Sequence, residues 1–225
     1  MNDKSQNNMY KLFRELGYVQ GIARMTIMSL KGFIESIRQL KCSREEVLPN
    51  YLELADSIRM SEPKIIPLIH LLSRFENEMQ DSLADSVTTE GIRERAIASL
   101  ERQIALFESN MAKVTENGRK YVEDGDVIIV HSPSSVVTNI LVDAKTKSHK
   151  HFTVIILDHN PERTRQIILA LREADIRHTV APAHNLSHYI EKASKMFVGA
   201  MTMTTDKKMI APTGTAGTVS LCHHN

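Results

Sequence analysis

Residues 125–130 read GDVIIV, a glycine and an acidic residue followed by four β-branched apolar side chains. A short continuous apolar run of this kind is typical of a strand buried on both faces of a sheet. Similar runs follow at 152–157, 178–181 and 195–198. The intervening segments have helical patterns and cover residues 134–147, 161–174 and 185–192. Strands that alternate with helices at this spacing predict a parallel sheet with right-handed crossovers.

The chain before residue 120 has a different period, because apolar side chains recur there every three to four positions. This is the period of helices with one buried face. We expect four helices, over 9–40, from Ser43, from Ser61 and over 89–120. The predicted fold class is α + α/β, with an N-terminal helical domain (1–120) and a Rossmann-like parallel α/β domain (121–225).

Several residues predict where these helices start, break and end. Ser43 and Glu46 have the spacing of a capping box, in which each side chain satisfies a backbone amide at the helix start. A break is expected between Gly17 and Gly21, since glycine weakens a helix interior. The pair 117–118, Asn-Gly, is a predicted C-terminal cap for the fourth helix.

Composition excludes several classes of protein. With 28 basic and 27 acidic side chains the net charge is +1, which predicts no basic surface and no DNA partner. No apolar run approaches the length that spans a membrane, and the polar first residues lack the apolar core of a signal peptide. Cys42 and Cys222 predict no disulfide framework and no metal site. We expect a cytoplasmic protein without membrane contact.

Three serines follow the first predicted strand, at the edge where parallel sheets bind their ligands. Ser132, Ser134 and Ser135 lie between this strand and the next helix. Hydroxyls and amides at a helix N-terminus suit an anion such as phosphate. The alternative is that Ser134 simply caps the helix that follows.

Two further candidates lie later in the chain. Asp158 follows the second strand and could cap the next helix or bind a ligand that carries hydroxyl groups. Gly214 and Thr215 stand before the last predicted helix, where their amides could receive an anion or form only a turn and cap. With Ser132, Ser134 and Ser135, these residues make the predicted ligand-binding set.

No cofactor, metal or catalytic residue is predicted from spacing. No G-x-G-x-x-G sequence follows any strand, which argues against a dinucleotide. His149, His151 and His159 are close in sequence, but a strand separates them and its side chains alternate between faces. A metal site formed by these histidines is therefore not expected.

Five segments together resemble one family. Residues 125–137, 152–161 and 189–200 are similar to strand and loop motifs of the initiation factor 2B alpha/beta/delta family, and residues 21–24 and 62–68 to patches of its helical half. The resemblance covers about residues 15 to 225. The family also includes isomerases of methylthioribose-1-phosphate and ribose-1,5-bisphosphate.

The resemblance implies that the residues needed for isomerase chemistry have been replaced. The isomerases use a cysteine and an aspartate at the positions of Ser132 and Met201, and a methionine cannot transfer a proton. Their phosphate-binding arginines correspond to Gln20 and Glu62, and a carboxylate would repel a phosphate. An Asn-Lys pair corresponds to residues 211–212, Ala-Pro, whereas Gly214 and Thr215 are kept.

The function expected from this resemblance is non-catalytic, a regulatory or scaffolding role in translation initiation through protein contacts. Its partners would be a second copy, related subunits or a translation initiation factor. The alternative is a protein that binds a sugar phosphate or nucleotide, or a divergent aldose–ketose isomerase. Family members continue beyond the segment similar to 215–224 with another strand, so we expect an α/β domain shortened at its C-terminus.

Overall fold

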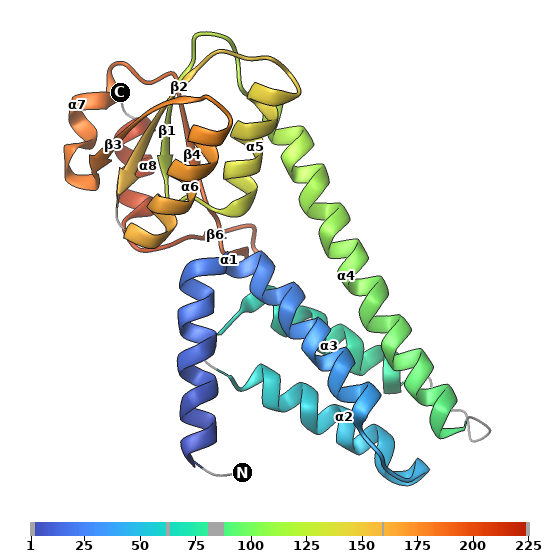
Figure 1. Cartoon of the computed structure of the whole chain (residues 1–225). Coiled ribbons are helices and arrows are strands. Elements are labelled where there is room, and N and C mark those ends of the chain that lie inside the picture. The colour runs from blue at the N-terminus through green and yellow to red at the C-terminus, as the bar shows by residue number, and fades with distance from the viewer. Residues whose placement is uncertain (1–2, 62–63, 81–87, 159, 224–225) are drawn as a thin grey trace. The chain divides into compact units, whose positions relative to one another are not determined.

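The computed structural model describes residues 3–61, 64–80, 88–158 and 160–223, with their side chains from Gly21 onward. The chain divides into two compact units, Met1–Ser109 and Asn110–Asn225, and each is described by itself (Figure 1). The predicted domain boundary between residues 120 and 121 stays a prediction.

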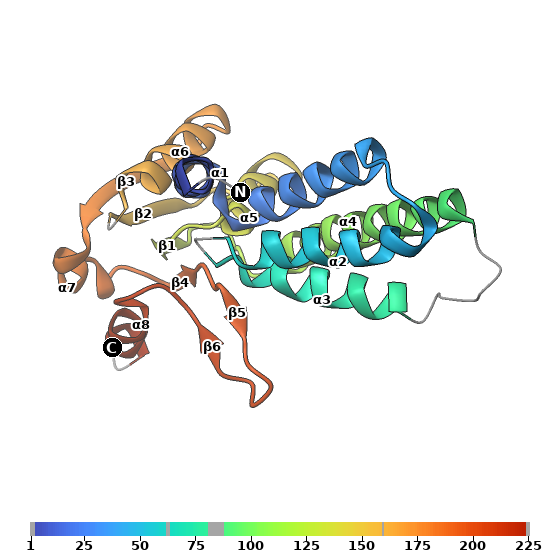
Figure 2. The same ribbon diagram turned by 90° about the horizontal axis from the view of Figure 1, so that it is seen from below.

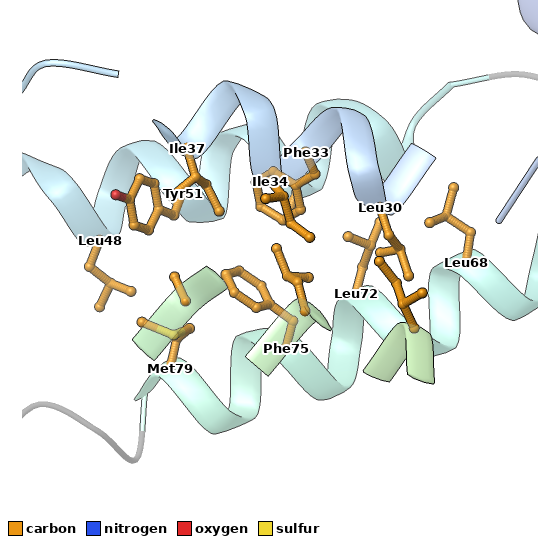
Figure 3. Packing of buried hydrophobic residues seen from close by; sticks show 14 of the residues in the cluster. Leu30, Phe33, Ile34, Ile37, Leu48, Tyr51, Leu68, Leu72, Phe75 and Met79 are labelled. Carbon is orange, nitrogen blue, oxygen red and sulfur yellow. The ribbon is translucent and has the colours of Figure 1, made fainter. Parts of the chain in front are cut away.

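The first unit consists of helices. These are α1 (Asp3–Gln39), α2 (Arg44–Arg59), α3 (Ile66–Gln80) and the first part of α4 (Thr89–Arg119). Their apolar stripes face a common core in which Phe33 meets Phe75 edge to face, with ring centroids 5.1 Å apart. Figure 3 shows this packing, with Leu72 of α3 beside Leu30 of α1.

The local signals at the helix ends were largely correct. Gly21 interrupts α1 with φ 75° and ψ 159°, a backbone conformation that suits glycine, so the predicted break is confirmed. The capping box is confirmed as well, because the Ser43 N–H donates to the Glu46 carboxylate at 3.1 Å. The third helix was expected from Ser61 but begins later, as α3 at Ile66, and it carries Pro67 in its first turn, where a missing N–H costs little.

The predicted cap at Asn117-Gly118 was wrong. Helix α4 continues through Gly118 to Arg119. A Cβ atom on Gly118 would lie 2.3 Å from Cδ1 of Ile140, a residue of α5 (Ser135–Thr146). The glycine therefore permits close packing of two helices rather than a left-handed turn.

The second unit contains a four-stranded parallel sheet. Its strands are β1 (Val127–His131), β2 (Thr153–Asp158), β3 (Arg177–Pro182) and β4 (Lys195–Val198), in the order β3-β2-β1-β4. The predicted parallel sheet is therefore confirmed.

Alternation along the central strands explains their continuous apolar sequence. Ile128 and Val130 face one core with α5 and α6 (Pro161–Glu173), while Ile129 faces a second core with α7 (Leu186–Ile190). Helices cover the sheet on both sides (Figure 1). A strand with helices on both faces needs an apolar side chain at every position.

Two features near the C-terminal end of the chain differ from the expectations. The short helix predicted over 185–192 is present as α7, but it ends at Ile190 and a 3-10 turn, Ala183–Asn185, precedes it. An antiparallel hairpin of β5 (Thr202–Met203) and β6 (Met209–Ile210) precedes α8 (Thr215–His223) (Figure 2). Its strands of two residues each are too short to produce a periodic sequence signal.

A buried carboxylate joins the beginnings of β1 and β4. Asp126 accepts hydrogen bonds from the Ser194 hydroxyl at 2.7 Å and the Glu123 N–H at 2.8 Å, and its oxygen lies 2.9 Å from Nζ of Lys195. Burial raises the pKa of Asp126, but these hydrogen bonds and the lysine charge outweigh it and hold the pKa below its usual value. The ionised form is therefore stabilised by folding.

Because folding lowers the pKa of Asp126, this carboxylate makes the second unit less stable as the pH falls. We expect the stabilisation from Asp126 to be complete above about pH 4, the unfolded value, and to be lost as the pH falls through the lower folded value. Urea unfolding of the second unit between pH 6 and 3 measures this loss. Replacing Asp126 with Asn should flatten the acid limb of the curve, and an unchanged limb would contradict the assignment.

Candidate functional site

The carboxyl edge of the parallel sheet has a switch point between β1 and β4. From β1 the chain crosses to β2 and β3 on one side and then returns to place β4 on the other side. The loops after β1 and β4 therefore leave the sheet in opposite directions, and ligands of open α/β sheets bind in the crevice at this point. We take the residues at this edge as the candidate site.

The loop after β1 has an unusual backbone. Ser132 is buried with φ 52°, a left-handed conformation that few residues other than glycine adopt. Its carbonyl accepts a hydrogen bond from the Gly199 N–H at 3.1 Å. A Cβ on Gly199 would lie 2.2 Å from this carbonyl oxygen and 3.3 Å from Cβ of Ser134. The loops after β1 and β4 thus touch, and only glycine fits at position 199.

The other two serines of this loop have different surroundings. Ser134 caps α5, because its hydroxyl accepts a hydrogen bond from the Val137 N–H at 3.2 Å. The capping prediction is confirmed, and the predicted ligand contact remains a prediction. Ser135 is the first residue of α5 and is exposed.

The beginning of α8 approaches the same edge. Gly214 has φ 88°, and a Cβ on it would lie 3.9 Å from Nε2 of His131, the buried last residue of β1. Thr215 is 4% exposed, and its hydroxyl forms no hydrogen bond with any residue in the described ranges. The predicted residues Ser132, Ser134 and Gly214 are therefore grouped around the switch point, with Thr215 next to them.

Asp158 has a different role from the capping role predicted for it. Asn160 caps α6 by accepting a hydrogen bond from the Arg163 N–H at 3.1 Å. The Asp158 carboxylate accepts a hydrogen bond from the Thr164 hydroxyl at 2.8 Å. Since β2 pairs with β1 on the side away from β4, Asp158 does not lie at the switch point.

The family resemblance indicated several positions where isomerase residues have been replaced. Some of these positions lie at this edge. Met201 is half-buried, and its N–H donates to the Ile210 carbonyl at 2.8 Å, at the base of the β5–β6 hairpin. Glu62 and His159 lie outside the described residues, and so does the side chain of Gln20. Within the described ranges, no group of three His, Cys, Asp or Glu side chains could hold a metal ion.

Two residues at the switch point, His131 and Gly199, were not in the predicted ligand-binding set. His131 looked like a structural histidine in sequence, and Gly199 was seen only as the end of a strand. The position of His131 as the last residue of the first strand was the available signal, because strand ends form the ligand edge of such sheets. No local signal showed that Gly199 must admit the Ser132 carbonyl.

The fold defines the class: an open parallel α/β sheet with a strand switch point between β1 and β4. The sequence matches the Initiation factor 2 subunit family over residues 18–225. The chain belongs to this family, as the motifs of its two halves suggested.

Individual relatives carry two kinds of name. The chain is 26% identical over 141 residues to translation initiation factor eIF2B subunit delta of Dictyostelium discoideum, covering 62% of this chain and 23% of that protein. It is 26% identical over 164 residues to ribose 1,5-bisphosphate isomerase of Haloferax volcanii, covering 72% of this chain and 49% of that enzyme. The chain thus spans less than half of either relative.

Solved structures share the fold. A subunit in the tetrameric eIF2B-beta2-delta2 complex from C. thermophilum superposes with a TM-score of 0.78 at 17% identity, covering 90% of this chain and 67% of that one. In the described parts of the chain, no helix combines the length and apolarity needed to cross a membrane.

Proposed function

We propose that this chain is a non-catalytic member of the family that acts in translation initiation through contacts with a second copy or with related subunits. The observation that carries the proposal is the chemistry at the switch point. By the family resemblance, Ser132 stands at the position of the isomerase cysteine and Met201 at that of the aspartate, at the carboxyl edge of a four-stranded parallel sheet.

The loss of these groups removes the route for proton transfer. An aldose–ketose isomerase moves a proton between neighbouring carbons, and this requires a titratable group within hydrogen-bond reach. Met201 has none, and an unaided serine hydroxyl is too weak an acid to replace a thiol at neutral pH.

An isomerase assay tests this part of the proposal. The chain is incubated with ribose 1,5-bisphosphate or methylthioribose-1-phosphate, and the ketose product is followed by NMR. We expect no conversion above a protein-free control, with the Haloferax volcanii enzyme as the positive control for its own substrate. Turnover that disappears in Ser132→Ala would overturn the proposal.

Exposed apolar side chains on the second unit support a role in protein contacts. Met203 and Met209 of the hairpin are 67% and 56% exposed, and Ile210 is 45% exposed. Val219 of α8 is 41% exposed. Three of these side chains belong to one hairpin, and apolar side chains exposed together often mark interaction sites in proteins.

Charged substitutions on the hairpin test this surface. We expect the double variant Met203→Lys/Met209→Lys to weaken association with related subunits at least tenfold, because two lysines would be desolvated in the interface. Co-purification of tagged subunits measures it. Met60→Lys is the matched control, since Met60 is 72% exposed but lies in the first unit. Equal effects of both changes would contradict an interface at the hairpin.

A second candidate function is binding of a small anion at the switch point without chemistry. The buried Thr215 hydroxyl favours it, since a buried hydroxyl without a partner costs about 1–3 kcal/mol and a bound oxygen atom would satisfy it. A Cβ on Gly214, which has φ 88°, would lie in van der Waals range of the buried His131 ring at the same edge.

Replacing Thr215 with Val, which has the same shape, tests whether the Thr215 hydroxyl is unsatisfied in the free protein and contacts a bound anion. We expect the free protein to become about 1 kcal/mol more stable to urea, because an unsatisfied hydroxyl is removed. Any thermal stabilisation by sugar phosphates at this edge should disappear. Thr218→Val is the control, since the Thr218 hydroxyl donates to the Gly214 carbonyl at 3.0 Å and its removal should not stabilise. A destabilised Thr215→Val would show that the hydroxyl is already satisfied.

A further inference from the structure

A pocket of about 750 Å³ opens at the amino edge of the sheet, the edge opposite the switch point. It is bounded by the two residues before β1, by the first residues of β2 and β3, and by the final turns of α5 and α6. All of these elements belong to the second unit. The volume lies within the range of sites that hold small molecules in proteins, which is roughly 300–1,000 Å³.

The pocket combines an apolar floor with a basic lining. Phe152 and Ile176 are 8% and 4% exposed, so their side chains are largely covered. The cationic and imidazole side chains of the lining come from four separate segments and are Lys145, His151, Arg172, Arg177 and His178. Arg172 and Arg177 are exposed and Lys145 is half-buried, so these cations border the hollow and also reach solvent.

Three of the cations that line the pocket have no partner among the described residues, whereas His151 of the lining lies 3.6 Å from Asp124 and neighbouring lysines outside the pocket have partners. Lys147 pairs with Asp143 at 2.7 Å, and Lys150 pairs with Asp124 at 3.3 Å. Lys145, Arg172 and Arg177 form no ion pair or side-chain hydrogen bond with any residue in the described ranges. Three cations without partners around one hollow leave it with an unbalanced positive charge.

The acidic lining residues do not cancel this charge. Asp126 is buried and is already paired with Lys195 at 2.9 Å. Asp175 is exposed at the end of α6, with φ 54°. One carboxylate therefore faces three cations that have no other partner among the described residues.

His178 adds a directed polar atom. Its Nδ1 lies 2.8 Å from the Ile176 carbonyl, and since a carbonyl can only accept, Nδ1 carries the proton. Nε2 is then left for another partner. The side chain is half-buried at the start of β3 and lines the pocket.

Helix dipoles explain only part of this arrangement. Lys145 and Arg172 lie in the last turns of α5 and α6, where cations are favoured. Arg177 and His178 lie on a strand, so the dipoles do not account for them. Two arginines line the pocket, and guanidinium groups suit the oxygen atoms of a phosphate, which accept bidentate hydrogen bonds.

We propose that this pocket binds a small phosphate ester of about nucleotide size, through Lys145, Arg172 and Arg177, with His178 holding a further polar group. The site is separate from the switch point and lies at the opposite ends of the same strands.

Isothermal titration with ADP and with pyrophosphate tests the proposal on the full chain. We expect saturable binding that weakens with added salt and falls at least about tenfold in the double variant Arg172→Gln/Arg177→Gln. Arg165→Gln is the matched control, because Arg165 is an exposed arginine of α6 outside the pocket lining. Circular dichroism shows whether each variant folds.

The variants distinguish binding in this pocket from binding elsewhere on the chain. Loss of binding in Arg172→Gln/Arg177→Gln, with binding kept in Arg165→Gln and in Thr215→Val, supports the pocket. Absence of saturable binding by both probes would overturn it, and so would an equal loss in Arg165→Gln. Loss in Thr215→Val alone would place the ligand at the switch point, and binding of oligonucleotides but of neither small probe would also overturn the proposal.

Discussion

Replacing Gly199 with alanine is expected to destabilise the second unit by about 3 kcal/mol or more. The new Cβ would lie 2.2 Å from the Ser132 carbonyl oxygen, and this neighbour is backbone. The carbonyl cannot move away cheaply, because it accepts the Gly199 N–H within a buried loop that already has a left-handed residue. Both loops at the switch point would have to shift.

Urea unfolding followed by circular dichroism measures this effect, and Gly217→Ala provides the control. Gly217 is an exposed residue of α8, and a Cβ there meets no atom within 4 Å. Its replacement should stabilise the chain by roughly 0.5–1 kcal/mol through helix propensity. If Gly199→Ala behaves in the same way, the close approach of the two loops is not real.

Replacing Asp126 with alanine is expected to cost about 3 kcal/mol, since it breaks a buried ion pair and leaves other groups unsatisfied. The Ser194 hydroxyl, the Glu123 N–H and the Lys195 ammonium would each lose an acceptor. Because Asp126 precedes β1 and Lys195 begins β4, the loss should loosen the edge strand β4. Faster hydrogen exchange of the amides in β4 would report this directly.

Glu123→Ala is the matched control for this change. Glu123 pairs with the same lysine at 3.1 Å, but its side chain is 73% exposed. Exposed pairs contribute less than about 1 kcal/mol, so the control should have a small effect and leave β4 protected. A loss as large as that of Asp126→Ala would mean that the lysine, rather than the buried carboxylate network, holds the strand.

The sheet could be predicted because its signals are local. The apolar run at 127–130 specifies a strand covered on both faces, and helices on both sides of the sheet account for it. The start of α5 also follows from an adjacent residue, since Ser134 is a good cap. For α6 the predicted capping residue was Asp158, whereas Asn160 caps the helix. Such features depend on residues within one turn of each other.

The remaining features depend on residues that are distant in sequence. Nothing beside Gly199 indicates that the Ser132 carbonyl lies against it, and nothing beside Asp126 identifies Ser194 and Lys195 as its partners. The amino-edge pocket also gathers side chains from separate segments. At Gly118 a local rule gave a wrong prediction. The rule indicated a helix cap, but the glycine is needed because Ile140, which is distant in sequence, packs against it.

We propose that this family member works through contacts with related subunits and not through isomerase chemistry. Sedimentation velocity of the chain, alone and mixed with the initiation factor 2B-type subunits of its own organism, tests it most directly. We predict a faster-sedimenting species that contains this chain and is lost in Met203→Lys/Met209→Lys. A chain that sediments as a monomer, both alone and in every mixture, would contradict the account.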